Sequence, residues 1–261
     1  MSDITQTPQQ VRPFWIWAVV SGAFAANVFG IVVVNYWIYY ARAAFIATHP
    51  AYVAVQPPTI SRAISDPVIG IPFAFWISVS AVTLVFGVAC LALIHLHTAR
   101  IAPFGSRRAH RIFLGAVVAA PIAQIGSGIG MYILSNFRFP EANAMHMVGS
   151  YTFFVAQGLV ILAALIGCLA WRSSQVSLGR MADKGTMRSR MLRLRIWVGY
   201  ASIGLTVGYI LLFAMKNVDI GAFNAPLYTA YVLAEPVVIS SFLLLLALFQ
   251  TDFIGAIRRS E

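Results

Sequence analysis

The sequence predicts an all-α polytopic membrane protein, a bundle of six transmembrane helices with both termini in the cytoplasm. Hydrophobic residues make up 60% of the chain and charged residues only 10%, and the mean hydropathy is +0.81. Soluble domains carry roughly 25% charged residues, so this composition excludes an ordinary water-soluble fold. Apolar runs of about 20 residues or more, long enough to cross a bilayer as helices, recur along the chain.

We expect one membrane domain over residues 15–253, between cytoplasmic tails at 1–14 and 254–261. The first apolar run is too long for the hydrophobic part of a signal peptide and has no small-residue cleavage site, so it should be retained as a helix. The six spans are expected near residues 15–41, 71–96, 112–135, 145–171, 193–215 and 226–249.

Lysine and arginine are concentrated in every second connection. The two tails and the 97–111 and 172–195 connections hold 14 of these residues, and the other side holds Arg42, Arg62, Arg138 and Lys216. By the positive-inside rule, both termini are therefore cytoplasmic. The net charge of +10 is explained by this topology and by contact with anionic lipid, and no nucleic-acid partner is expected. Compact connections and arginine-rich turns favour a bacterial inner membrane over a eukaryotic endomembrane.

The longest connection, about 29 residues between the first two spans, is expected to form a turn-rich cap. It contains prolines at positions 50, 57, 58, 67 and 72, which argue against a long helix. Loops longer than about 12 to 15 residues in compact proteins are often functional. Ser61 and Asp66 lie in this connection.

Polar side chains in the spans must face neighbouring helices, a cavity or water. Four spans carry such residues at helical spacing, which suggests a shared polar interior. They are Asn27 and Asn35 on the first span, Gln124 and Ser127 on the third, His146, Ser150 and Gln157 on the fourth, and Tyr228, Tyr231 and Glu235 on the sixth.

Glu235 and the following Pro236 lie in the middle of the last apolar run. A charge at the bilayer centre costs roughly 2.5 to 3.5 kcal/mol on insertion scales, so an intramembrane carboxylate indicates either a hydrogen-bonded partner or a site. We expect Glu235 to face inward, below Tyr228 and Tyr231 and near Gln157, with Pro236 kinking the helix. His146 should lie nearer the outer surface, at the rim of the polar interior with Asp66 and Glu141.

Motifs for catalysis are weak. Metal binding by His146, Glu235 and Asp66 is conceivable, but closely spaced histidines are lacking there, and no metal is expected. Ser61 near Asp66 fits turn capping better than a nucleophile. The chain has no Walker, dinucleotide or haem motif, so no cofactor is expected. Cys90 and Cys168 fall in apolar runs and have the character of core residues.

Three stretches resemble the FRAG/DRAM/SFK superfamily, which includes the damage-regulated autophagy modulators. They are "PPTISRAISD", "NFRFPEANAMHMVGSYTFF" and "LAEPVVISSFLLLLALFQTDF". The resemblance covers roughly residues 15–253 and implies the six-span fold and a link to lipid remodelling or lipid organisation, with no agreed catalytic chemistry. The positions that it singles out are Pro58, Ile60, Ser61, Asp66, Asn136, Phe137, His146, Gly149, Ala234 and Glu235.

Three functions remain open. The preferred one is a non-enzymatic protein that binds a lipid headgroup in an outward-opening polar pocket and affects lipid organisation or a membrane partner. The second is a lipid-modifying enzyme with Glu235 or His146 as acid or base. The third is an accessory subunit that joins a larger membrane complex through the aromatic "NYWIYYARAAF" of the first span. The pocket residues are Glu235, His146, Gln157, Tyr231, Asp66, Ser61 and, by resemblance, Asn136.

Overall fold

The computed structural model describes residues 14–101, 103–177, 189–216 and 218–257. In the part that it describes, six long helices and three short ones account for the secondary structure, and no strand occurs. The long helices are α1 (Phe14–Thr48), α4 (Pro67–Ile101), α5 (Arg107–Asn136), α6 (Asn143–Ser177), α7 (Ser189–Met215) and α8 (Asn224–Ile257). The short ones are α2 (Pro50–Val53), α3 (Ile60–Ala63) and the 3-10 helix η1 (Gly221–Phe223).

All six long helices are long and apolar enough to cross a membrane, which confirms the predicted fold class. Several sequence-based expectations fall on residues outside the described ranges. These are the N-terminal tail up to residue 13, the last four residues, and six of the counted basic residues: Arg12, Arg180, Lys184, Arg188, Arg258 and Arg259.

The helices extend beyond the apolar runs because their ends are set by capping residues. α4 begins at Pro67, four residues before the expected span, with Asp66 Oδ1 accepting the N–H of Val68 at 2.8 Å. Proline is well suited to a first helical position, where its missing N–H has no partner to lose. α5 likewise begins after Ser106, whose hydroxyl accepts the N–H of Arg108 at 3.2 Å.

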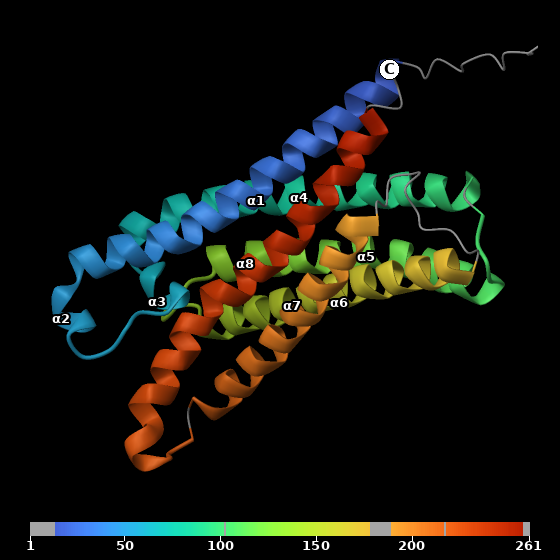
Figure 1. Cartoon of the computed structure of the whole chain (residues 1–261). Coiled ribbons are helices and arrows are strands. Elements are labelled where there is room, and N and C mark those ends of the chain that lie inside the picture. The colour runs from blue at the N-terminus through green and yellow to red at the C-terminus, as the bar shows by residue number, and fades with distance from the viewer. Residues whose placement is uncertain (1–13, 102, 178–188, 217, 258–261) are drawn as a thin grey trace, which may run out of the picture.

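The long helices form a closed bundle in chain order (Figure 1). Each packs against the next, and α8 returns to pack against α1. α8 also contacts α4 and α6, so it lies closest to the middle of the bundle. The start of α1 and the end of α8 lie at the same end of the bundle, where the Phe24 and Phe253 rings are 6.3 Å apart. That this end faces the cytoplasm stays a prediction.

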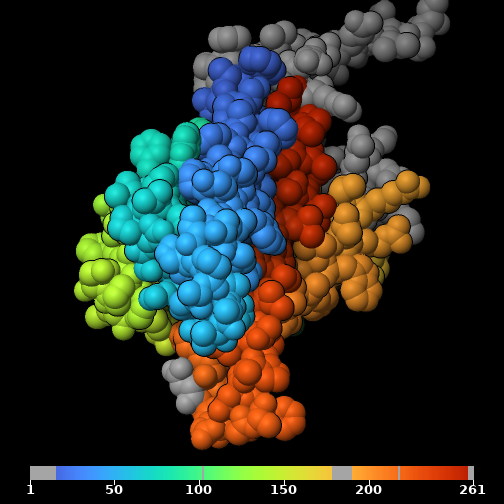
Figure 2. All heavy atoms as spheres, turned by 90° about the vertical axis from the view of Figure 1, so that its left-hand side faces the viewer, coloured from blue at the N-terminus to red at the C-terminus, as the bar shows by residue number. Residues whose placement is uncertain are grey.

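The connection between α1 and α4, residues 49–66, forms what we call the α2–α3 cap. Its prolines permit two helices of only four residues each, with Pro50 at the start of α2. The cap folds over one end of the bundle, and the start of α8 projects beyond it (Figure 2). α8 continues as one helix through Pro236.

α5 and α6 cross at glycines. A Cβ at Gly130 would collide with the backbone N of Phe153, and one at Gly149 would lie 2.5 Å from the backbone N of Leu134. The two backbones can therefore touch only because these side chains are absent. The crossing sets the position of the first turn of α6 against the last turn of α5.

Candidate functional site

The α2–α3 cap is held by side chains from three long helices. Arg42 of α1 donates to the Pro58 carbonyl at 3.2 Å, and Glu235 of α8 accepts the N–H of Ile60 at 3.0 Å. Ser61 is 2.8 Å from His146 of α6. The cap is therefore tied to α1, α8 and α6 within four consecutive residues.

Glu235 faces inward, as expected from the sequence, and its side chain has its partner in the cap. The residue is only 6% exposed, and Oε2 accepts from the first residue of α3. The first N–H groups of a helix have no partner within the helix, so a carboxylate placed there satisfies one of them. Thr59 serves the same helix by accepting the N–H of Arg62 at 3.0 Å. This pairing explains how a carboxylate is accommodated inside the bundle.

His146 is buried, and the groups around it define its tautomer. Its Nδ1 lies 2.8 Å from the carbonyl oxygen of Leu134 and 3.0 Å from that of Phe137. Carbonyl oxygens only accept, so Nδ1 carries the hydrogen. In the neutral imidazole, Nε2 then has a free lone pair, and the Ser61 hydroxyl donates to it.

The glycine crossing of α5 and α6 explains how His146 reaches these carbonyls. His146 lies three residues before Gly149, and Leu134 is the residue whose backbone Gly149 touches. Close approach at Gly149 therefore brings the imidazole within hydrogen-bond distance of the last turn of α5. The side chain is only 2% exposed, so its orientation is restricted.

A cavity of about 610 Å³, which we call the Glu235 cavity, lies beneath the cap among α6, α7 and α8. This volume is within the range of roughly 300 to 1,000 Å³ that small-molecule sites occupy. Four of the expected site residues line it: Glu235, His146, Ser61 and Tyr231.

Tyr228, which was expected on the polar face of the sixth span, also lines the cavity. Other lining residues were not expected from the sequence: the cations Arg62 and Lys216 and the aromatic residues Tyr52, Phe139, Tyr151, Phe154, Tyr209 and Phe213. Tyr209 and Tyr231 stack with their ring centroids 5.5 Å apart. The cavity thus combines charged groups with an aromatic wall.

Arg62 and Lys216 were counted in the sequence only as topology charges. Arg62 lies over the ring of Tyr52, with Cζ 5.0 Å from the centroid. Lys216 Nζ lies 4.1 Å from the Phe213 centroid. Burial lowers the pKa of the Lys216 ammonium below its ordinary value, and the Glu235 carboxylate partly offsets this by raising it. Arg62 directly follows the candidate residue Ser61 in the sequence, and this neighbour relation could have indicated Arg62 as a site residue.

The remaining expected site residues lie outside the cavity lining. Gln157 accepts a hydrogen bond from Ser127 at 2.7 Å, between α6 and α5. Asp66 caps α4, with its Oδ2 3.8 Å from His49. Asn136 is exposed at the end of α5 and donates to Ser78 at 3.1 Å. The polar residues of the spans therefore belong to several local sites.

The family model described as the Frag1/DRAM/Sfk1/Cwh43P N-terminal domain matches residues 13–256. The chain belongs to this family. No curated protein and no solved structure matches the chain.

The Frag1/DRAM/Sfk1 positions singled out by resemblance are largely in contact with one another. Ile60 bonds to Glu235, and Ser61 bonds to His146. His146 also bonds to Phe137, and Gly149 is the crossing point that positions it. The short motifs from three distant parts of the chain therefore meet at the Glu235 cavity and its cap.

A second buried polar cluster lies toward the opposite end of the bundle. Arg195 pairs with Asp252 through hydrogen bonds of 3.0 and 2.8 Å, and His95 Nε2 is 2.8 Å from the same carboxylate. Arg195 was expected in the 172–195 connection, but it is a fully buried residue of α7. Asp252, three residues beyond the last expected span, was the available signal for this cluster.

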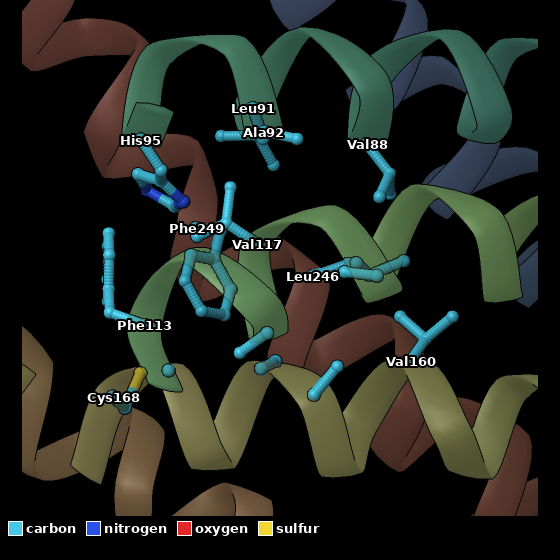
Figure 3. Close-up of a pocket in the computed structure, with 15 residues that line it drawn as sticks. Val88, Leu91, Ala92, His95, Phe113, Val117, Val160, Cys168, Leu246 and Phe249 are labelled. Carbon is cyan, nitrogen blue, oxygen red and sulfur yellow. The ribbon is translucent and has the colours of Figure 1, made fainter. Parts of the chain in front are cut away.

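Next to this cluster is an apolar cavity of about 60 Å³ among α4, α5, α6 and α8 (Figure 3). His95 lies at one end of it, near Phe113 and Phe249. Apart from His95 and Cys168, its lining is apolar, so it offers few groups that could orient a polar ligand.

Some buried amides have no hydrogen-bond partner within the described part of the chain, namely both side-chain polar atoms of Asn27 and of Gln124. Among the same residues, no group of three or more His, Cys, Asp and Glu is arranged to hold a metal ion. The Glu235 cavity is therefore the strongest candidate site.

Proposed function

We propose that this Frag1/DRAM/Sfk1-family protein binds the phosphate-bearing headgroup of a membrane lipid in the Glu235 cavity, and thereby affects lipid organisation or a membrane partner. The observation that carries the proposal is the presence of Arg62 and Lys216 on the wall of a cavity of about 610 Å³. Arg62 lies in the cap and Lys216 directly follows α7, so both cations face the cavity from just outside the spanning helices. A lipid phosphate is the anion that the bilayer supplies.

The chemistry of Arg62 fits this ligand. Its guanidinium offers a planar set of donors suited to phosphate oxygens. Its Nε is buried and has no hydrogen-bond partner among the described residues. A headgroup phosphate in the cavity would accept from it. Glu235 provides a carboxylate in the same cavity, which suits the amine of a zwitterionic headgroup.

The aromatic wall fits the rest of a lipid. The rings of Phe154, Phe213 and Tyr209 line the same cavity and give apolar surface next to the charged groups. Acyl chains or a glycerol backbone can pack there while the phosphate meets the cations. By the positive-inside rule the cap lies on the non-cytoplasmic side, and the compact connections favour a bacterial inner membrane as the location.

Lipid binding to the full-length protein in mild detergent tests the proposal. Short-chain phosphatidylglycerol is titrated as an anionic probe and short-chain phosphatidylcholine as a zwitterionic one. Arg62→Gln and Lys216→Gln should each weaken binding of the anionic probe by about tenfold, equivalent to about 1.4 kcal/mol.

The matched control is Arg138→Gln. Arg138 lies at the same end of the bundle but outside the lining of the Glu235 cavity. The Arg138→Gln variant should bind the anionic probe with the affinity of the wild type. Equal affinities for wild type and all three variants would contradict a headgroup site in this cavity.

A further inference from the structure

Ser61 and His146 form a hydrogen-bonded pair on the wall of the Glu235 cavity. We propose that Ser61 is a nucleophile and His146 its general base, and that the pair cleaves an acyl ester of the lipid bound in the cavity. The inference rests on the proposed function, because the cavity must first hold that lipid. It adds a reaction to what would otherwise be a binding site.

The geometry meets the requirements of an activated serine. The distance of 2.8 Å between Ser61 Oγ and His146 Nε2 lies within the roughly 2.6 to 3.2 Å expected for a nucleophile and its base. The base is oriented in turn by a third group, here the backbone carbonyls of Leu134 and Phe137 on Nδ1. These bonds hold the tautomer in which Nε2 can take the serine proton.

Both partners are held in place by independent contacts. Ser61 is the second residue of α3, whose first N–H is bonded to Glu235. His146 is buried and held by the crossing of α5 and α6 at Gly149. Productive geometry requires such support, since misplacement by about 1 Å can cost about 100-fold in rate.

The reaction balances without a further reagent except water. Ser61 Oγ bonds to the ester carbonyl carbon as its proton passes to His146 Nε2. When the tetrahedral intermediate collapses, the bond from carbon to the lipid alcohol oxygen breaks, and Nε2 returns the proton to that oxygen. Water then attacks the acyl-serine and gives a proton to Nε2, and the departing Ser61 oxygen takes it back. The products are a lysolipid and a fatty acid.

A purely structural role would make the pair a latch between the cap and α6. Both roles predict lower stability on substitution, so stability cannot distinguish them. A fluorophosphonate probe can, because it reacts covalently with activated serine hydroxyls. The full-length wild-type protein in mild detergent should be labelled at Ser61, identified by peptide mass spectrometry.

Three variants test whether labelling depends on the Ser61–His146 pair. Ser61→Ala should lose the label, and His146→Gln, which keeps donors for the carbonyls but is no base, should slow labelling by at least about 100-fold. The control is Ser65→Ala: Ser65 lies in the same cap, donates to the Arg62 carbonyl at 2.7 Å and lies outside the cavity lining. The Ser65→Ala variant should be labelled at Ser61 at the wild-type rate. Thermal transitions of all variants report whether they fold.

Product formation separates this inference from the proposed function. Phosphatidylglycerol in mixed micelles should yield free fatty acid with wild type and none with Ser61→Ala, while Ser61→Ala still binds the lipid. A wild-type protein that binds phosphatidylglycerol but releases no fatty acid and takes no label at Ser61 would overturn the inference and leave the proposed function standing. A protein that does not bind the lipid would overturn both.

Discussion

The Ser61 hydroxyl lies 2.8 Å from Nε2 of His146, although 85 positions of sequence separate the two residues. This bond joins the α2–α3 cap to α6, and the bond between Ile60 and Glu235 joins the cap to α8. The cap is thus a fixed wall of the Glu235 cavity. Substitutions that loosen the cap should change the cavity as well as the stability of the fold.

Glu235→Ala should destabilise the protein by about 1 to 3 kcal/mol, because it leaves the buried N–H of Ile60 without an acceptor. Glu235→Gln should cost much less, since its amide oxygen can still accept from Ile60. Thermal unfolding in detergent measures both. Glu141→Gln, at an exposed position, is the control. Equal losses for Ala and Gln would show that charge, and not the hydrogen bond to the cap, is what matters at this position.

Gly149→Ala should destabilise the protein by about 1 to 3 kcal/mol through overpacking. The new Cβ would lie 2.5 Å from the backbone N of Leu134, forcing α5 and α6 apart. The hydrogen bond from His146 to Leu134 should weaken with it. Chemical denaturation compares this variant with Gly158→Ala on the same helix, where the nearest atom is 4.0 Å away.

Gly158→Ala should be neutral or stabilise the helix by up to about 1 kcal/mol, because alanine has the higher helix propensity. If both alanine variants behaved alike, the close crossing at Gly149 would not be important for stability.

Replacing one partner of the Arg195–Asp252 pair should be strongly destabilising, by about 3 to 5 kcal/mol, because it leaves a buried charge uncompensated. Arg195→Leu and Asp252→Leu are the single variants. The double variant should recover much of the loss, since apolar residues often replace a buried ion pair with little net cost. Unfolding measurements on the four proteins form a double-mutant cycle. Additive losses would contradict a coupled pair.

Binding of anionic lipid should weaken as the pH rises, because the Lys216 ammonium loses its charge. Burial lowers the pKa of this group below its ordinary value of 10.5, and Glu235 offsets only part of the shift. The charged form is therefore lost at lower pH than for an exposed lysine. Titration of short-chain phosphatidylglycerol between about pH 7 and pH 10 should show the decline.

Lys216→Arg provides the control for this pH dependence, since arginine stays protonated throughout the range. Its affinity should stay level where that of wild type falls. The same decline in both proteins would assign the pH dependence to a group other than Lys216.

The fold was predictable because hydropathy alone distinguishes six membrane-spanning runs from their connections. The helix ends were not, since capping residues such as Asp66 and Ser106 extend the helices into polar sequence. Composition could not show that the helices close into a ring, which depends on contacts between α1 and α8.

Part of the site was predictable from the cost of polar groups in lipid. That rule singled out Glu235 and His146, and resemblance added Ser61. The sequence could not show that Ile60 bonds to Glu235, 175 positions away, because helical periodicity describes one helix at a time and says nothing about contacts between distant segments. Arg62 and Lys216 were missed because a count of loop charges treats every connection residue as solvated.

The accessory-subunit function stays a prediction. Tyr36, Tyr39 and Tyr40 of α1 are exposed on the bundle surface, as that function requires. Lipid would cover such a face equally well, so the exposure of these tyrosines does not distinguish a protein partner from surrounding lipid. Stoichiometric co-purification of another membrane protein would support it.

The most direct test of the account is an experimental structure of the full-length protein purified with its native lipids. We predict ordered headgroup density inside the Glu235 cavity, within hydrogen-bond distance of Arg62 or Lys216 and beside the Ser61–His146 pair. A cavity closed by its own side chains, with lipid density ordered only on the outer surface of the bundle, would contradict it.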